Sequence, residues 1–165
     1  MNNTRVLYIL FIGILVAIFV GVGIDTFYTG PKRPDYRNYE VKSIAVKAQP
    51  TAEEMTELNK QQEEYQEANE EYQKKLKFYN RNVSIFAMAA AVIIVITSLL
   101  LLSKIILIAD GLLLGSVLSL GYSVVRGFMT EDNTYRFLAV SVSLAVALTI
   151  GYFRFIRGNK EIPSR

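Results

Sequence analysis

The chain of 165 residues has no cysteine, no histidine and no tryptophan. Without cysteine it forms no disulfide, no thiolate nucleophile and no cysteine-ligated zinc or iron–sulfur centre. Without histidine it lacks the usual acid–base group near neutral pH and the commonest metal ligand. No base accompanies the serines and threonines of its apolar runs, and no glycine-rich phosphate loop is present. We therefore expect a protein that is not an enzyme and that holds no cofactor and no metal.

What the chain has in excess is hydrophobic sequence, which makes up 52% of its residues. Much of it falls into four apolar runs of about 20 residues, the length of a transmembrane helix. The net charge of +3 is small, and basic residues cluster beside the apolar runs, which favours a lipid bilayer over nucleic acid as the partner. The sequence predicts an all-α integral membrane protein with four transmembrane helices.

The order of apolar and polar stretches divides the chain into eight segments. They are a first transmembrane helix (1–24), a Pro/Tyr-rich irregular linker (25–50), a charged extramembrane helix (51–82), a second (83–102) and a third (105–125) transmembrane helix, a short polar loop (126–136), a fourth transmembrane helix (137–153) and a basic C-terminal tail (154–165). The first apolar run, Val6–Ile24, exceeds the about 7–15 residues of a signal-peptide core, so we expect it to stay uncleaved. Only Ser103 and Lys104 separate the second and third helices, which predicts a tight hairpin.

Small residues recur every four positions in each span, and this spacing lets helix backbones approach closely within lipid. The clearest examples lie in the first and third spans, at Gly13, Ala17, Gly21, Gly111, Gly115 and Ser119. Such rows serve either to join copies of the chain or to pack the four helices of one chain into a bundle. We favour packing within one chain, because a four-helix bundle needs such faces.

The extramembrane helix is predicted from Pro50 onward. Thr51 and Glu54 match a capping box, and neither Gly nor Pro occurs from there to Asn82. An apolar residue recurs every seventh position, as in a coiled-coil seam, at Leu58, Tyr65, Tyr72, Tyr79 and Phe86. The row continues into the second span, so we expect one helix over about 52–102 whose outer part is about 45 Å long. The linker, a second copy or another protein would cover this seam.

Charge is segregated along the extramembrane helix. Residues 51–73 hold eight Glu and one Lys, a net of −7, whereas residues 74–82 hold a net of +4. We expect the basic residues next to spans to lie at the membrane surface, namely Lys74, Lys75, Lys77, Arg81, Arg154 and Arg157. Nine basic residues flank the spans on the side of the long helix and six on the side of the termini. This bias predicts residues 25–82 in the cytoplasm, although the basic tail points the other way.

Asp110 is the one carboxylate inside an apolar run. An ionisable group there indicates an ion or proton site, or else a contact with Lys104 or interfacial water, which we favour because Asp110 lies close to the end of its span. The loop 126–136 offers three neighbouring oxygen ligands, Glu131, Asp132 and Asn133, without the spacing of an EF-hand. We expect an ordinary turn there.

Three functions are compatible with these features. We favour a non-catalytic membrane scaffold or accessory subunit that recruits a partner or a second copy through residues 51–82. The alternative is a small oligomeric channel or transporter that uses Asp110 and polar residues of the third span.

We expect the protein to lie in a prokaryotic plasma membrane, because the chain has no retention or transit signal.

The third function rests on the order of helices over residues 6–125. A charged helix between the first two spans resembles the layout of the YidC-type membrane-insertase family, in which a cytosolic coiled coil precedes a polar groove. This resemblance implies a role in membrane-protein biogenesis. It involves no shared motif, and the chain has a single outer helix instead of a helical hairpin and no arginine at mid-span.

Overall fold

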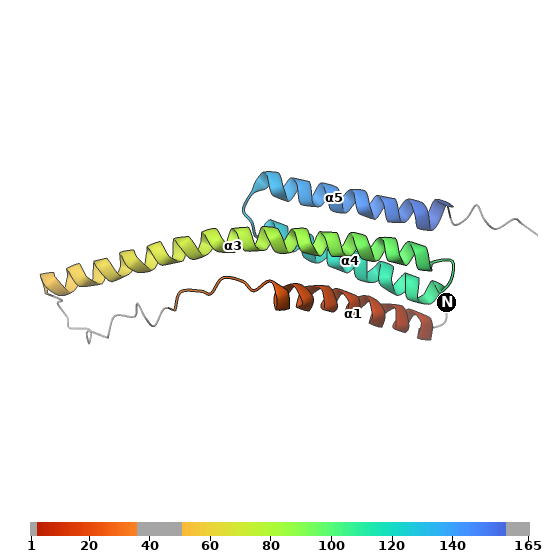
Figure 1. Cartoon of the computed structure of the whole chain (residues 1–165). Helices are drawn as coiled ribbons and strands as arrows, with labels where there is room; N and C mark the ends of the chain where they lie inside the picture. Colours follow the sequence, from red (N-terminus) through yellow and green to blue (C-terminus); the bar gives the residue numbers. More distant parts are fainter. Residues whose placement is uncertain (1–2, 36–50, 158–165) are drawn as a thin grey trace, which may run out of the picture. The chain divides into compact units, whose positions relative to one another are not determined.

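The computed structural model describes residues 3–35 and 51–157, apart from the side chains of Glu54, Leu58 and residues 155–157. This part of the chain is all-helical, as the sequence predicts, and it contains no strand (Figure 1). Its elements are α1 (Asn3–Phe27), α3 (Ala52–Leu101), α4 (Ile106–Phe128), α5 (Asn133–Gly151) and a π-helix, η1 (Tyr152–Arg157). The remainder of the predicted linker, 36–50, and of the tail, 158–165, lies outside the described residues.

All four α-helices are long and apolar enough to cross a membrane, which suggests an integral membrane protein. Within a bilayer a helix is the element that satisfies every backbone N–H and C=O inside a single segment. α3 runs unbroken for 50 residues, and the lack of Gly and Pro in it removes the usual causes of a break or kink.

Capping and turns, more than hydropathy, set the helix ends. α1 begins before and ends beyond the apolar run Val6–Ile24, and Gly30 and Pro31 follow its last turn. α5 begins four residues before the predicted start at Phe137, because one Asp132 carboxylate oxygen accepts hydrogen bonds from the backbone N–H groups of residues 134 (2.9 Å) and 135 (3.2 Å). The predicted basic tail begins inside η1, a π-helix that no pattern in the sequence indicates.

The structure divides into two compact units. The first, here called the bundle, comprises Met1–Thr29 and Asn80–Arg165, and the second, the outer unit, comprises Gly30–Tyr79. α3 contributes its residues from Asn80 onward to the bundle and its residues up to Tyr79 to the outer unit.

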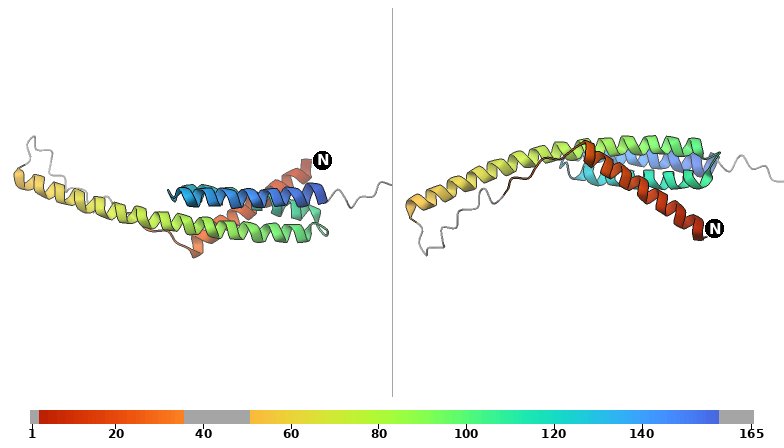
Figure 2. Two further views of the ribbon diagram at one scale, coloured as in Figure 1. Left: turned by 90° about the horizontal axis from the view of Figure 1, so that it is seen from above. Right: turned by 60° about the horizontal axis from the view of Figure 1, so that its bottom comes forward.

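In the bundle, α4 packs against α1 and α5 and forms hydrogen bonds with α3. Figure 2 shows these helices from two further directions. The contact with α1 is close because both helices present glycines. A Cβ atom added at Gly115 would lie 2.6 Å from Cβ of Val16, and one at Gly111 would lie 2.7 Å from Cγ2 of Ile12. On α1, Gly13 is equally tight against Leu114.

The part of α3 inside the bundle buries residues spaced by four, as expected for one face of a helix. These are Val83, Ala87, Ala91 and Val95. Larger apolar side chains of α1 and α5, such as Phe19 and Leu144, are exposed on the outside of the bundle. Small residues inside and large ones outside are typical of a bundle that lipid surrounds.

Candidate functional site

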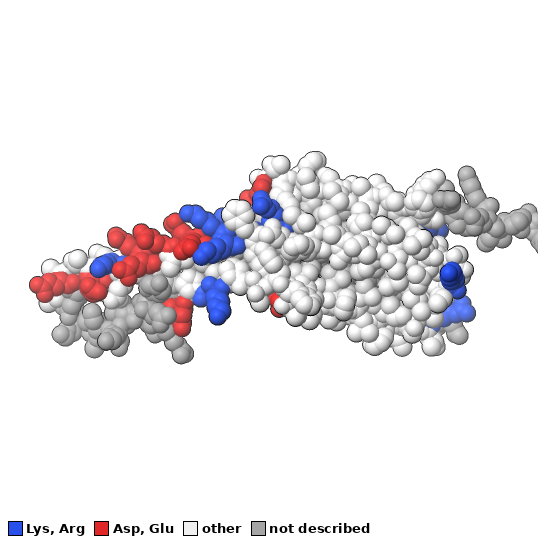
Figure 3. Space-filling model, in the orientation of Figure 1, with Lys and Arg blue, Asp and Glu red and all other residues white. Residues whose placement is uncertain are grey.

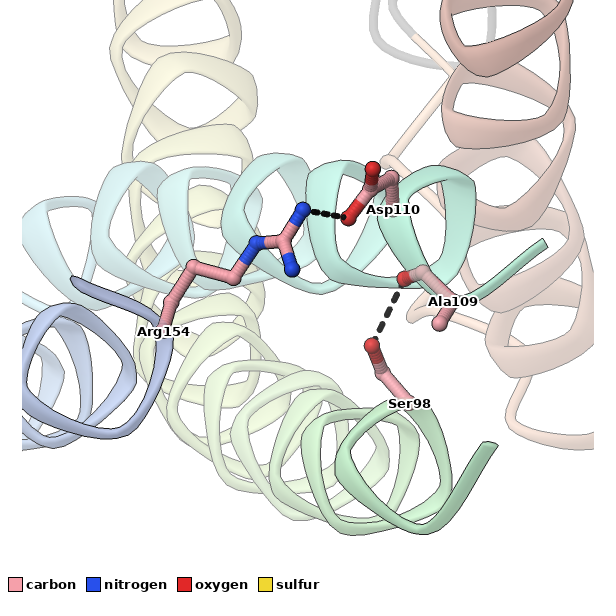
Figure 4. A network of polar contacts seen from close by, with 4 residues as sticks. All are labelled: Ser98, Ala109, Asp110 and Arg154. Carbon is pink, nitrogen blue, oxygen red and sulfur yellow. Dashed lines mark hydrogen bonds and ion pairs between the residues drawn. The ribbon is translucent and has the colours of Figure 1, made fainter. Parts of the chain in front are cut away.

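An ion pair links α4 to the chain segment that follows α5. The guanidinium of Arg154, which lies in η1, is 2.7 Å from a carboxylate oxygen of Asp110 (Figure 4). Their side chains are 31% and 22% exposed, so the pair is partly shielded from solvent. Beside it, the hydroxyl of Ser98 on α3 donates a 2.6 Å hydrogen bond to the carbonyl oxygen of Ala109. This polar cluster therefore joins α3, α4 and η1 at one end of the bundle.

The sequence-based expectations did not include this pair. Lys104 or interfacial water was the expected neighbour of Asp110, whereas Lys104 lies exposed in the turn between α3 and α4. Arg154 was expected at the membrane surface, and its guanidinium contacts the Asp110 carboxylate at one end of the bundle. The side chain of Arg157, the other basic residue expected there, is outside the described part of the structure. A π-helix has wider i→i+5 turns than an α-helix, which changes the direction of the side chains after residue 151. Hydropathy alone therefore does not predict which way the Arg154 side chain points.

The serines of α4 are committed to hydrogen bonds within the bundle. Ser116 and Ser119 are buried and donate to carbonyl oxygens of their own helix, at 2.6 and 2.9 Å. Ser84 on α3 and Ser123 on α4 are both fully buried and donate to each other's carbonyl oxygens, at 2.7 and 2.8 Å. The Ser84–Ser123 pair thus joins α3 to α4, whereas the hydroxyls of Ser116 and Ser119 bond within α4.

A second polar cluster lies at the opposite end of the bundle. Arg126 near the end of α4 donates to the amide oxygen of Asn80 and to the hydroxyl of Tyr122, both at 3.0 Å. The amide of Asn82 donates to the hydroxyl of Tyr28 at 2.8 Å, and the Tyr28 ring packs edge-on against Phe86. Sequence reasoning did not single out these pairs, although polar residues close to the ends of apolar helices are a signal that could have indicated them.

The residues expected to pack helices fall into two groups. Gly13, Gly111 and Gly115 lie in the α1–α4 contact, and Ser119 is buried within α4. Ala17 is half-buried, and a Cβ atom at Gly21 would meet nothing within 4 Å. Of the three small residues predicted to pack on α1, Gly13 therefore lies in the tight contact with α4 and Gly21 does not.

In the outer unit, three members of the predicted seam lie on one face of α3. We call Tyr65, Tyr72 and Tyr79 the tyrosine row. The first two are half-buried and Tyr79 is buried, with 8% of its surface exposed. A Cβ atom at Gly30 would lie 3.2 Å from the Tyr79 ring, so the linker backbone covers this ring. The other seam members differ: Phe86 belongs to the bundle, and the Leu58 side chain is outside the described part.

The remaining surface of the outer unit is strongly charged. Acidic side chains cover the first part of the helix and basic ones follow, as the red and blue atoms of Figure 3 show. Of the basic residues in this unit, Lys74 and Lys75 are exposed and Lys77 is half-buried; Arg81, which belongs to the bundle, is also exposed. Lys75 donates to the carboxylate of Glu71 at 2.7 Å, and this hydrogen bond and the positive charge of Lys75 lower the pKa of Glu71.

The described residues contain no group of three or more carboxylates arranged to hold a metal ion. In the loop between α4 and α5, Asp132 caps α5 and the Asn133 side chain accepts a hydrogen bond from Arg136. Both oxygen-bearing side chains thus stabilise the start of a helix.

No protein-family model, curated protein or solved structure matches the chain.

Proposed function

We propose that the protein is a non-catalytic membrane scaffold or accessory subunit that recruits a partner, or a second copy, through residues 51–82. The observation that carries this proposal is the exposed, charge-segregated helix of the outer unit. The carboxylates at Glu57, Glu63, Glu64, Glu67 and Glu70 are all exposed. Such a surface favours contact with a basic partner, because complementary charge guides association and excludes partners of like charge.

The geometry of the bundle supports a structural role for the membrane part. The Asp110 carboxylate is neutralised by Arg154, and Ser116, Ser119 and Ser123 bond to backbone carbonyls. A cation path through one chain needs carboxylate or hydroxyl oxygens that face water, but the three serines are buried and the Asp110 carboxylate faces Arg154. We therefore prefer the scaffold over the channel.

The proposal includes a location and an orientation. We place the protein in a prokaryotic plasma membrane with residues 25–82 on the cytoplasmic side. Anionic lipids of the cytoplasmic leaflet favour the basic segment 74–82 by about 1 kcal/mol per charge, which would leave the acidic segment facing the aqueous phase.

A photo-cross-linking scan in native membranes tests the proposal. A photoreactive amino acid replaces Glu57, Glu63 or Glu70 in turn, and as matched controls Phe19 and Leu144, which are exposed on the outside of the bundle. We expect adducts of one defined protein mass from the three helix positions and lipid adducts alone from the two controls. Lipid adducts or no adducts from all three helix positions would contradict the proposal.

A further inference from the structure

The linker segment Gly30–Asp35, here called the strap, lies beside the tyrosine row within the outer unit (Figure 1). Gly30 covers the ring of Tyr79 so closely that a Cβ atom there would be 3.2 Å from the ring carbon Cζ. Arg33, Pro34 and Asp35 line a hollow of about 560 Å³ together with Tyr65. The strap therefore contacts the row at Tyr79 and shares a hollow with Tyr65 toward the other end of the row.

The distance between these two points requires an extended strap. Tyr65 and Tyr79 are fourteen residues apart, which corresponds to about 21 Å along a helix. The four residues from Gly30 to Pro34 span at most about 14 Å, so the strap must be extended to reach from Tyr79 to the hollow beside Tyr65. Residues 29–35 have neither helix nor turn structure. Pro31 and Pro34 restrict their own φ angles and push the residues before them toward extended conformations.

Burial separates the roles of the strap residues. Pro31 and Pro34 are half-buried, whereas Lys32 and Arg33 between them are exposed. The prolines are thus the more buried of these four residues, and the two cations are exposed in the same unit as a helix whose residues 51–73 carry a net charge of −7. Aromatic rows recognise proline-containing extended segments elsewhere because such segments lose little conformational entropy on binding.

We propose that the tyrosine row is a recognition surface for extended, basic, proline-containing segments, and that the strap of the same chain is its occupant. This inference deepens the proposed function and rests on it, because it names the chemistry that a partner needs to displace the strap. A tethered strap competes at an effective concentration in the millimolar range. A free segment therefore binds the row well only after the strap is released.

The direct test uses the full chain in nanodiscs and a peptide of residues 29–35. Peptide binding is followed by NMR signals of labelled tyrosine rings, in the wild type and in the strap variant Pro31→Ser/Pro34→Ser. We expect the peptide to bind the strap variant at least about tenfold more tightly than the wild type. Absence of binding to the strap variant would overturn the proposal.

A second arm changes the peptide and leaves the protein untouched, so misfolding cannot explain its result. Alanine replaces both prolines while the charges stay the same. We expect about tenfold weaker binding to the strap variant. Equal binding of the two peptides would mean that charge alone is recognised, which contradicts recognition of proline.

Matched changes on the helix locate the binding surface. In the strap variant, Tyr65→Ser/Tyr79→Ser should abolish peptide binding. Phe78→Ser should preserve it, since Phe78 is an aromatic residue of the same helix that is 60% exposed and lies off the row. Equal loss in both variants would contradict a role for the row.

The chain has no native cysteine, so labels placed at Lys32→Cys and Gln73→Cys report on strap docking without background. We expect a defined distance when both labels are in one chain and no signal when they are in different chains. Loss of the distance within one chain, with the same distance appearing between different chains, would show that a second copy supplies the strap, which contradicts occupancy by the same chain.

The peptide assay needs only purified protein, whereas the cross-linking scan reports on native membranes. Failure of the peptide to bind, with cross-links retained, would overturn this inference alone. Peptide binding without cross-links would overturn the proposed recruitment alone.

Discussion

At the scale of single residues, polar contacts join the helices of the bundle. Their partners could not be predicted from the apolar sequence around them. Asp110 and Arg154 form an ion pair that is partly shielded from solvent, and Ser84 and Ser123 exchange hydrogen bonds in full burial. In a low-dielectric setting a lone charge is costly, but a pair is tolerated. The position of Asp110 in an apolar run was visible in the sequence. Its partner was not, because Arg154 is 44 residues away and its direction depends on η1.

We predict that Asp110→Asn and Arg154→Gln each lower the free energy of unfolding by about 1–2 kcal/mol, because each leaves one charge without its partner. The double variant should lose less than the sum of the two, which steric trapping in bicelles would measure. The same Asp110→Asn protein should show no change in ion flux across liposomes. A change in flux would favour the channel over the scaffold.

The lowered pKa of Glu71 in the outer helix gives a residue-scale prediction about pH. Because Lys75 lowers the pKa of Glu71 in the folded chain, the pair stabilises the helix above the ordinary pKa of Glu71. This contribution is lost as the pH falls through the lowered pKa. An NMR titration of the Glu71 carboxyl should give a higher pKa in Lys75→Gln than in the wild type. An unchanged pKa would contradict the pairing.

At the scale of elements, the spacing of small residues predicted which of them share one face of a helix. The small residues at Gly13, Gly111 and Gly115 stood out by their spacing of four, and they lie in the α1–α4 contact. Gly21 has the same spacing but meets nothing within 4 Å. Spacing shows that two residues share a face, but it does not show how far a neighbouring helix follows that face. The crossing geometry of two helices decides this, and it depends on both partners.

A matched pair of glycine variants in α4 tests this contact. Gly115→Val should lower the free energy of unfolding by about 1–3 kcal/mol, because its Cβ would lie 2.6 Å from Val16. Gly121→Val should have little effect, since a Cβ at Gly121 meets nothing within 4 Å. Steric trapping compares the two. Equal destabilisation would show that helix propensity, and not the α1 contact, determines the loss.

For the tyrosine row, too, the sequence predicted a shared helix face but not what lies against it. The seven-residue spacing of Tyr65, Tyr72 and Tyr79 predicted a seam that needs a cover, and the linker, a second copy and another protein were all open. The structure places Gly30 of the linker against Tyr79. Sequence alone could not choose, because a linker without periodic hydrophobicity gives no signal of where its backbone lies.

At the scale of the whole molecule, composition predicted the helical class and the four candidate membrane helices, since apolar length is a property of the chain itself. Orientation depends on the weaker bias of basic residues. We predict that Glu64→Cys in intact cells is protected from an impermeant thiol reagent, whereas Ser164→Cys is labelled. Labelling of Glu64→Cys from outside would reverse the orientation.

The central claim is that the protein works by assembly through the outer part of α3. Its most direct test is the mass of particles extracted from native membranes into polymer-bounded discs. The wild type should give particles heavier than one chain, and so should Asp25→Asn, which removes an exposed carboxylate of the bundle. The variant in which Glu63, Glu64, Glu67 and Glu70 become Gln should fall to the mass of a single chain. Single-chain mass in the wild type, or an unchanged assembly in the Glu variant, would contradict the account.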